Sequence, residues 1–304
     1  MRRIAVLITI VAVCIGLIAG ADSAWKKFKV SAPEPPPQQP VNQSTPEPAG
    51  KSGESVFTKQ VYGYSGEQRE LEVYRISATG RPYKKLLCVF ALHGFEDAFY
   101  RDGRLLTDTA RYLTAYFKEH SQELGAYELL VVPAANPDGA ARGTTCKGPG
   151  RCQISLGIDM NMDFDYSFKP RTNPRNLTGS RPFSSPESQA LRDLVLNEKP
   201  DIVIDFHGWV NSAAGDPQIT AIFNRLMGLS LNSEAGSIKA GYFSGWAGKY
   251  TRSVLVEYPD PFRGRGAYDK QTEYPIDYNQ DMVEKLGYGS KTVECIKEIA
   301  KQSS

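Results

Sequence analysis

The stretch Leu86-Leu-Cys-Val-Phe-Ala-Leu-His-Gly-Phe-Glu96 decides how the rest of this chain is to be interpreted. Its first seven residues are all apolar, and a run of this length that enters a turn is typical of a buried β-strand. The turn carries His93 and Glu96, and functional residues of open α/β sheets gather beyond the carboxyl ends of such strands. An imidazole and a carboxylate three residues apart can bind one metal ion if a third ligand comes from elsewhere, although most His-x-x-Glu pairs are chance surface pairs.

A second histidine stands in the same position after another apolar run. Residues 201–206 have a strand pattern, and His207 followed by glycine comes directly after them. The chain has three histidines, and the third, His120, follows charged residues at the end of an expected helix, where a surface position is the simpler interpretation. A single histidine at a strand end is more often a hydrogen-bonded core residue than a ligand. Two of them in one sheet favour the ligand set His93, Glu96 and His207, with a fourth coordination position open.

A carboxylate stands at the end of a third apolar run. The stretch Ser253-Val-Leu-Val-Glu-Tyr258 predicts a buried strand that has Glu257 near its end. A buried carboxylate without a partner is costly, and a neighbouring cation relieves that cost. A carboxylate beside a metal site can also transfer protons during hydrolysis. The sequence therefore predicts that Glu257 is a general base.

Strand and helix patterns alternate between residues 51 and 304. The predicted strands are residues 71–76, 86–92, 127–132, 201–206 and 253–258. Apolar residues at helical spacing predict helices at residues 105–117, from a start near Ser184–Glu187 to residue 196, at 219–231 and at 282–301. Such alternation is typical of a single α/β domain with a mostly parallel, mixed central sheet and helices on both faces.

The first 50 residues differ in composition from the rest. Residues 1–21 begin with two arginines and continue as an apolar stretch, which predicts a signal peptide or an N-terminal membrane anchor. Residues 22–50 are rich in proline and predict an extended linker. We therefore expect a secreted or extracytoplasmic, membrane-anchored protein whose folded domain spans residues 51–304. Cleavage after residue 21 stays open, and contact with a membrane would occur only through an uncleaved segment.

Charge and cysteine content narrow the class of partner. The chain has 36 Lys and Arg against 34 Asp and Glu, and two of the arginines lie in residues 1–21, so the remainder is balanced. No basic surface is expected that would attract nucleic acid. No Cys-x-x-Cys pair is present, which argues against zinc held by cysteines. Cys146 and Cys152 bracket a loop that could close a small disulfide in an exported protein, and their pairing stays open.

The order of these residues resembles that of the zinc carboxypeptidases related to carboxypeptidase A. His93-x-x-Glu96, a distant His207 and a later Glu257 stand in the family's order. Further segments that resemble the family are Tyr62–Arg69, Asn136–Gly139, Gly157–Phe164 and Pro182–Ser188. The first of them resembles the entry segment of bacterial members that cut cell-wall peptides. The resemblance extends from about residue 60 to residue 300 and implies a zinc carboxypeptidase-like fold with one Zn²⁺ per chain.

The resemblance also implies roles at the metal. His93, Glu96 and His207 would bind zinc, and Glu257 would act as general base and proton shuttle. Asp159 would accept a hydrogen bond from the first zinc histidine and so fix its ring.

Contacts to the substrate follow from the same resemblance. Asn161 matches the family residue that holds a carboxylate of the substrate. An arginine that stabilises the oxyanion should precede this segment; Arg151 is the first choice and Arg142 the alternative. Met162 departs from the family, whose residue there is an arginine that clamps the carboxyl terminus of the substrate. A thioether cannot replace a bidentate guanidinium.

Three aromatic residues and two arginines are further candidates near the substrate. Tyr242 or Tyr250 would be the mobile tyrosine of the family, and Trp246 would form a wall of the specificity pocket. Ordinary packing explains each of these aromatic residues equally well. Arg171 or Arg175 could supply the positive charge of the missing family arginine.

The expected function is that of an exported zinc metallopeptidase of carboxypeptidase type. It would hydrolyse peptide or amide bonds, with peptidoglycan stem peptides or other short peptides as substrate, and exo- or endo-cleavage stays open. The competing hypothesis is a catalytically weak envelope protein of the same fold that retains zinc and binds peptides. A serine hydrolase is disfavoured, because no Gly-x-Ser-x-Gly elbow follows a strand.

Overall fold

The computed structural model describes residues 55–78, 82–96, 98–99, 101–142, 150–229, 237–261 and 281–302. All of them belong to one compact unit that extends from residue 49 to residue 304. The predicted signal or anchor, the linker and Cys146 lie outside the described residues, and Cys152 carries a free thiol. No helix in the ranges given above is long and apolar enough to cross a membrane.

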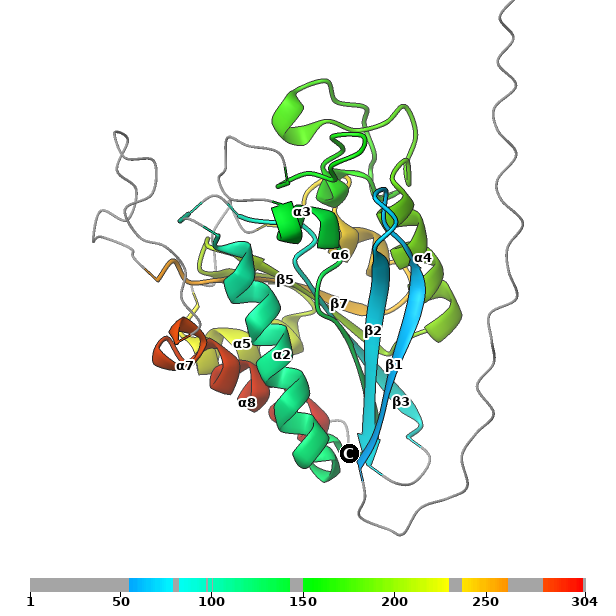
Figure 1. Cartoon of the computed structure of the whole chain (residues 1–304). Helices are drawn as coiled ribbons and strands as arrows, with labels where there is room; N and C mark the ends of the chain where they lie inside the picture. The colour runs from blue at the N-terminus through cyan, green and yellow to red at the C-terminus, as the bar shows by residue number, and fades with distance from the viewer. Residues whose placement is uncertain are drawn as a thin grey trace, which may run out of the picture. The chain divides into compact units, whose positions relative to one another are not determined.

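The described strands form one seven-stranded sheet in the order β1-β2-β4-β3-β5-β7-β6 (Figure 1). Their bounds are β1 Ser55–Tyr64, β2 Glu70–Ala78, β3 Lys84–Phe90, β4 Tyr127–Val132, β5 Ile202–Gly208, β6 Ser212–Gly215 and β7 Arg252–Tyr258. The central strands β4, β3, β5 and β7 run parallel, whereas β1, β2 and β6 run antiparallel to their neighbours. The mixed α/β sheet is therefore confirmed, and its parallel pairing is confined to the centre.

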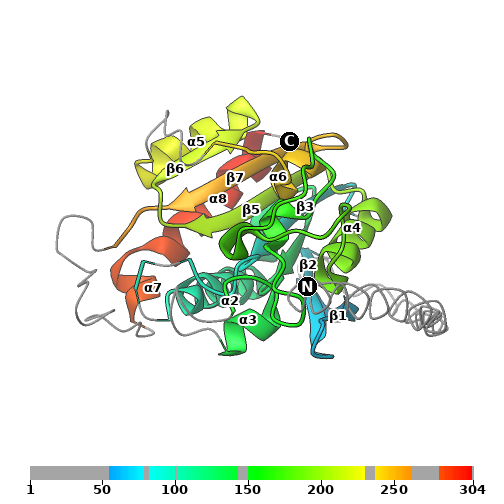
Figure 2. The same cartoon turned by 90° about the horizontal axis from the view of Figure 1, so that it is seen from above.

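Helices cover both faces of this sheet (Figure 2). Those packed on one face are α2 Gly103–Glu119, α5 Pro217–Met227 and α8 Tyr288–Gln302, and those on the other are α4 Pro186–Glu198 and α6 Phe243–Ala247. Alternate residues of β3 enter the two cores: Leu86 and Cys88 face the first, Leu87 and Val89 the second. A strand covered on both faces is apolar at successive positions, which explains the run at residues 86–92.

Most predicted elements are present. The predicted strands at residues 71–76, 86–92, 127–132, 201–206 and 253–258 correspond to β2, β3, β4, β5 and β7. The predicted helix at 105–117 lies within α2. The helix predicted to start near Ser184–Glu187 is α4, which is capped by Ser185 Oγ and has Pro186 in its first turn.

Two helix predictions are corrected. The helix expected at 219–231 ends earlier, because Gly228 adopts a left-handed φ of 70° directly after Met227. The single helix expected at 282–301 is two helices, α7 Met282–Lys285 and α8, separated at Gly287, whose φ is also 70°. Elements without a sequence prediction are β1, β6, α3 Pro137–Arg142, α6 and the 3-10 helices η1 Ser121–Leu124, η2 Met160–Met162 and η3 Pro174–Asn176.

Candidate metal centre and active site

Three neighbouring strands bring the predicted ligands and base to one edge of the sheet. His93 follows β3, and His207 and Glu257 lie directly opposite each other in the register of β5 and β7. Because β3, β5 and β7 are adjacent and parallel, their carboxyl ends meet at the same edge. Glu96 reaches this edge from the turn that follows His93.

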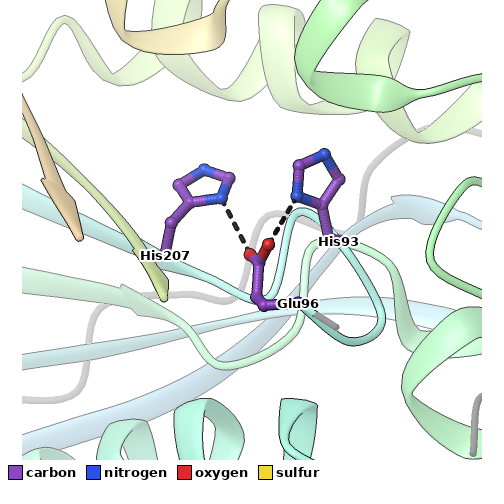
Figure 3. Close-up of side chains that lie close together, drawn as sticks. All are labelled: His93, Glu96 and His207. Carbon is purple, nitrogen blue, oxygen red and sulfur yellow. Dashed lines mark hydrogen bonds and ion pairs between the residues drawn. The ribbon is translucent and has the colours of Figure 1, made fainter. Parts of the chain in front are cut away.

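The three candidate ligands face one another (Figure 3). Glu96 Oε2 lies 2.9 Å from His93 Nδ1, and Glu96 Oε1 lies 2.9 Å from His207 Nδ1. Their ligand atoms all lie within 4.8 Å of one another, and no other such group of three occurs among the described residues. All three side chains are buried. Two imidazole nitrogens and a carboxylate in this arrangement form a ligand set that suits zinc.

A carboxylate lies behind each histidine. Asp159 Oδ1 is 2.9 Å from His93 Nε2, and Asp205 Oδ1 is 2.9 Å from His207 Nε2. A proton on each Nε2 that is donated to these carboxylates leaves both Nδ1 lone pairs directed at a metal ion. Asp159 thus lies where the resemblance predicts. Asp205 is absent from the sequence prediction, although its spacing of two residues from His207 in a strand places both side chains on one face and could have identified it.

The charges of the cluster favour a cation between the ligands. Burial by itself would raise the pKa of Glu96, but His93 and His207 outweigh it and lower this pKa. Burial would lower the pKa of His207, yet Asp205 and Glu96 hold it well above its usual range. The Glu96 carboxylate thus lies between two buried imidazole rings that interact with it favourably. Two imidazoles and one carboxylate that converge in this way fit a zinc ion.

Close backbone contact fixes the turn between the first two ligands. Gly94 N donates to the carbonyl of Arg151 at 3.1 Å. A Cβ atom on Gly94 would lie 2.1 Å from the carbonyl oxygen of Gly150 and 2.3 Å from the carbonyl carbon of Gly139. Only glycine fits at this position. The turn that carries His93 is therefore packed directly on the segment that carries Arg151.

Glu257 is a buried carboxylate whose Oε2 has no hydrogen-bond partner among the described residues. The residue is 9 % exposed, and burial raises its pKa to about 8 against the opposing effect of His207. A cation held by the ligands would favour the ionised form of this carboxylate. Burying a carboxylate oxygen without a hydrogen-bond partner lowers the stability of the fold. The position suits a general base that faces a metal ion and a substrate.

The structure distinguishes the two candidate arginines. Arg151 Nη1 donates to Asp159 Oδ2 at 3.1 Å, and Arg151 Nη2 lies 3.4 Å from His93 Nδ1. Arg142 instead pairs with Glu67 at 2.8 Å, and its side chain is 57 % exposed. Arg151 is therefore the arginine that the fold brings to the ligands.

Asn161 and Met162 lie side by side in η2. Asn161 N donates to Asp159 Oδ1 at 3.0 Å, and Asn161 Oδ1 accepts from Phe243 N at 3.1 Å. The backbone of Asn161 is thus bound to the Asp159 carboxylate, and its side-chain amide is bound to the start of α6. Met162 is 8 % exposed, and a Cβ atom on Gly241 would lie 2.5 Å from the Met162 carbonyl oxygen. An apolar side chain therefore stands next to Asn161 where the resemblance would place a guanidinium.

Of the aromatic candidates, Tyr242 is the one near the charged cluster. Tyr242 directly precedes Phe243, whose N donates to Asn161 Oδ1 at 3.1 Å, and burial and the charges of Glu257 and Asp159 raise the pKa of Tyr242. Trp246 is buried in the core on the α4 side of the sheet, and its role as a wall of the specificity pocket stays a prediction. Tyr250 is 60 % exposed and contacts Trp246 with 5.3 Å between ring centroids.

The loop after η2 carries the two other candidate arginines. The carbonyl of Arg175 accepts from Arg151 Nη1 at 3.2 Å, so the backbone of this loop touches the oxyanion candidate. The backbone of Arg171 pairs with Thr178 farther along the loop. Both positions remain candidates for contact with the substrate.

Comparison with known sequences agrees with this geometry. Residues 50–214 match the family model described as zinc carboxypeptidase. The bacteriocin BCN5 of Clostridium perfringens is 38 % identical over 209 residues, which cover 66 % of this chain and 23 % of the bacteriocin. The chain thus matches less than a quarter of that relative's length.

Solved structures share the fold at low sequence identity. The carboxypeptidase A of Helicoverpa armigera aligns with a TM-score of 0.56 and 18 % identity, covering 82 % of this chain and 69 % of that one. The murein-tripeptide amidase MpaA of Escherichia coli O157 aligns with a TM-score of 0.51 and 20 % identity, covering 80 % of this chain and 91 % of that one.

The chain belongs to the zinc carboxypeptidase family, because the family model covers more than half of it. Members of this family are zinc-dependent hydrolases that act on peptides. The matched region contains His93, Glu96 and His207 and ends before Glu257. The family match therefore does not extend to Glu257. The pairing of β5 with β7 is the observation that places Glu257 beside the candidate ligands.

Proposed function

We propose that this chain is an exported zinc-dependent metallopeptidase that hydrolyses peptide or amide bonds, with cell-wall stem peptides as its substrate class. One observation carries the proposal. His93, Glu96 and His207 converge with their ligand atoms within 4.8 Å, and Glu257 stands opposite His207 in the register of the neighbouring strand.

The residues around the ligands account for the remaining steps of hydrolysis. A zinc ion bound by the three ligands would act as a Lewis acid toward the scissile carbonyl and water. Glu257 would accept the proton of the attacking water and transfer it to the leaving amine. Arg151 would stabilise the negative charge that develops on the carbonyl oxygen of the substrate. Asp159 orients both His93 and Arg151, because each of its oxygens binds one of them.

Two features support a stem peptide as substrate. The segment Tyr62–Arg69 resembles the entry segment of bacterial members that cut cell-wall peptides, and the fold is shared with a murein-tripeptide amidase. Met162 itself supplies no guanidinium next to Asn161, which disfavours a substrate whose α-carboxylate is clamped from position 162. An amide-linked peptide that is bound along its chain fits this site better than a free carboxyl terminus does.

The decisive variant is Glu257→Gln, which keeps the volume of the side chain and removes the base. Zinc-loaded protein is assayed on peptides with free carboxyl termini, amidated termini and D-residues. The variant is expected to lose about 10²–10⁴-fold in kcat and to retain its zinc. Glu187→Gln, at a buried glutamate of α4 outside the ligand cluster, is the control for a lost buried charge. Full activity of the Glu257 variant would contradict the assignment.

Met162 also favours the second candidate function, a zinc-containing peptide-binding protein of the envelope with little turnover. The same panel separates the two functions. Tight binding of a peptide without any turnover by the zinc-loaded wild type would support the binding protein. Turnover that Glu257→Gln abolishes would support the enzyme.

Export is a part of the proposal that rests on residues 1–21 and 22–50. Fractionation of cells that express the full chain, with mass spectrometry of the amino terminus, is the test. We expect the protein outside the cytoplasm, either shortened near residue 21 or attached to the membrane. An intact chain found only in the cytoplasm would contradict export.

A further inference from the structure

Asp102 occupies the N-cap position of α2 but forms no side-chain hydrogen bond to that helix. Its Oδ1 accepts from Glu96 N at 2.8 Å, and its Oδ2 accepts from Ala98 N at 2.8 Å and from Trp209 Nε1 at 2.9 Å. The residue is 0 % exposed. An aspartate at this position ordinarily accepts from the first turn of its own helix. Here the three hydrogen bonds that its carboxylate accepts all come from other segments.

These bonds join the loop that carries His93 and Glu96 to the residue Trp209, which follows directly after the strand that carries His207. Glu96 is itself a ligand candidate, and Asp102 holds its backbone. Trp209 stands two residues after His207, so the indole hydrogen bond reaches the loop that follows β5. A single buried carboxylate therefore bonds to both the loop after β3 and the loop after β5.

The start of α2 packs directly on the first of these loops. A Cβ atom on Gly103 would lie 2.0 Å from the carbonyl oxygen of Gly94, which is the residue after His93. Backbone thus packs on backbone next to Asp102. The ring of Trp209 is confined as well, since it contacts Phe99 at 5.3 Å and Tyr288 at 6.0 Å between centroids.

We propose that Asp102 is a positioning residue of the metal centre, which sets the separation between the Glu96 loop and the end of β5 that carries His207, and thereby the affinity for the metal. The inference rests on the proposed role of these residues as zinc ligands. Ligands bind a metal tightly when neighbouring hydrogen bonds hold them in place before it arrives. The side chain of Asp102 bonds directly to the backbone of Glu96 and to the indole of Trp209, and so connects the loop after β3 with the loop after β5.

Zinc affinity is measured by competition with a chromophoric chelator on metal-free protein. Asp102→Asn is expected to weaken zinc binding about 10–100-fold, because an amide nitrogen would meet donors that now bind a carboxylate oxygen. Trp209→Phe removes only the indole donor and should weaken binding by a smaller factor. In the double variant the Trp209 change should add little, because its partner is already lost. The visible spectrum of the cobalt-substituted protein should also change, since it reports the arrangement of the ligands.

Asp163→Asn is the matched control. Asp163 is also fully buried and accepts from Ser184 N, Ser185 N and Ser188 Oγ at the start of α4, without a bond to the ligand loops. This variant should lower the stability of the metal-free protein to urea and leave the zinc Kd unchanged.

The possible outcomes separate the proposed zinc-binding function from the positioning role of Asp102. Wild-type protein that binds no zinc would overturn the proposed function and the inference together. Wild type that binds zinc, with unchanged Kd and cobalt spectrum in Trp209→Phe and Asp102→Asn, would overturn the positioning role alone. An equal loss of affinity in Asp163→Asn would also overturn it, because general instability would then be the cause. If Asp102→Asn does not fold, Trp209→Phe decides the matter by itself.

Discussion

At the scale of single residues, the two histidines are supported in the same way. Each imidazole has its Nδ1 toward Glu96 and its Nε2 toward an aspartate, Asp159 for His93 and Asp205 for His207. This arrangement fixes the tautomer that binds a metal and increases the electron density on the ligand nitrogen.

We predict from this pairing that Asp205→Asn weakens zinc binding by about 10–100-fold. An amide in place of the carboxylate orients His207 less firmly and no longer compensates the charge on its ring. Competition with a chelator measures the change, and Asp201→Asn, at the exposed start of the same segment, is the control. Equal affinity of the Asp205 variant and the wild type would mean that this carboxylate does not support the ligand.

A second prediction at this scale concerns specificity. Met162→Arg should raise kcat/KM for peptides with a free carboxyl terminus relative to amidated ones, because a guanidinium next to Asn161 can bind a carboxylate in bidentate fashion. Met162→Leu keeps the site apolar and should leave the ratio unchanged. The comparison uses matched pairs of free and amidated peptides. A ratio that stays the same in the arginine variant would show that position 162 does not face the carboxyl end of the substrate.

The sequence predicts the cluster of candidate ligands that the fold brings together, because His93 and His207 each follow an apolar run and stand out as two of three histidines. Residues that act through three-dimensional contact are harder to predict. Asp205 lies inside an apolar strand, where a core position is the simpler interpretation. Asp102 directly precedes a helix, where an aspartate is usually an ordinary N-cap. The spacing of residues in the sequence does not distinguish Tyr242 from Tyr250. The structure does, because Tyr242 is half-buried at the start of α6 and Tyr250 is 60 % exposed.

At the scale of elements, burial decides which strands the sequence predicts. β3 and β5 are covered on both faces and so carry continuous apolar runs. β1 lies at the edge of the sheet and is exposed over most of its length, so its sequence has no apolar period to detect. β6 has four residues, too few for a pattern.

The first turn of α5 provides a prediction about pH. Asp216 accepts from Gln218 N and Ile219 N and also pairs with Arg252 at 2.8 Å. The hydrogen bond from Arg252 lowers the pKa of Asp216 below its ordinary value. The carboxylate therefore stabilises the fold above the ordinary pKa of about 4, and this contribution is lost as the pH falls through the lowered value in the folded state.

Urea unfolding of metal-free protein between about pH 6 and pH 3 tests this prediction. Asp216→Asn keeps a cap acceptor and removes the charge, so it should cost about 0.5–1 kcal/mol of unfolding free energy near pH 6. The difference from wild type should shrink toward the acidic end, because Asp216 gains a proton as the pH approaches the lowered pKa of the folded state. A difference that is constant with pH would show that the ion pair does not contribute.

At the scale of the whole molecule, the candidate ligands come from a loop and a strand more than 100 residues apart in sequence, since Glu96 follows β3, His207 lies in β5, and the two are separated by 111 positions. Such a site exists only in the folded chain, so metal binding and folding are coupled. We predict that zinc at about a thousandfold excess over Kd raises the unfolding free energy by about 4 kcal/mol. Thermal unfolding with zinc and with a chelator measures the effect, and the double variant His93→Ala/His207→Ala should show no zinc-dependent shift.

The most direct test of the account is a zinc titration of the metal-free protein in which bound zinc and peptide hydrolysis are followed in the same samples. We predict that hydrolysis rises in proportion to bound zinc and saturates at one zinc per chain. The double variant His93→Ala/His207→Ala should bind no zinc and hydrolyse nothing. Hydrolysis that is independent of zinc, or zinc retained at full stoichiometry by the double variant, would contradict the account.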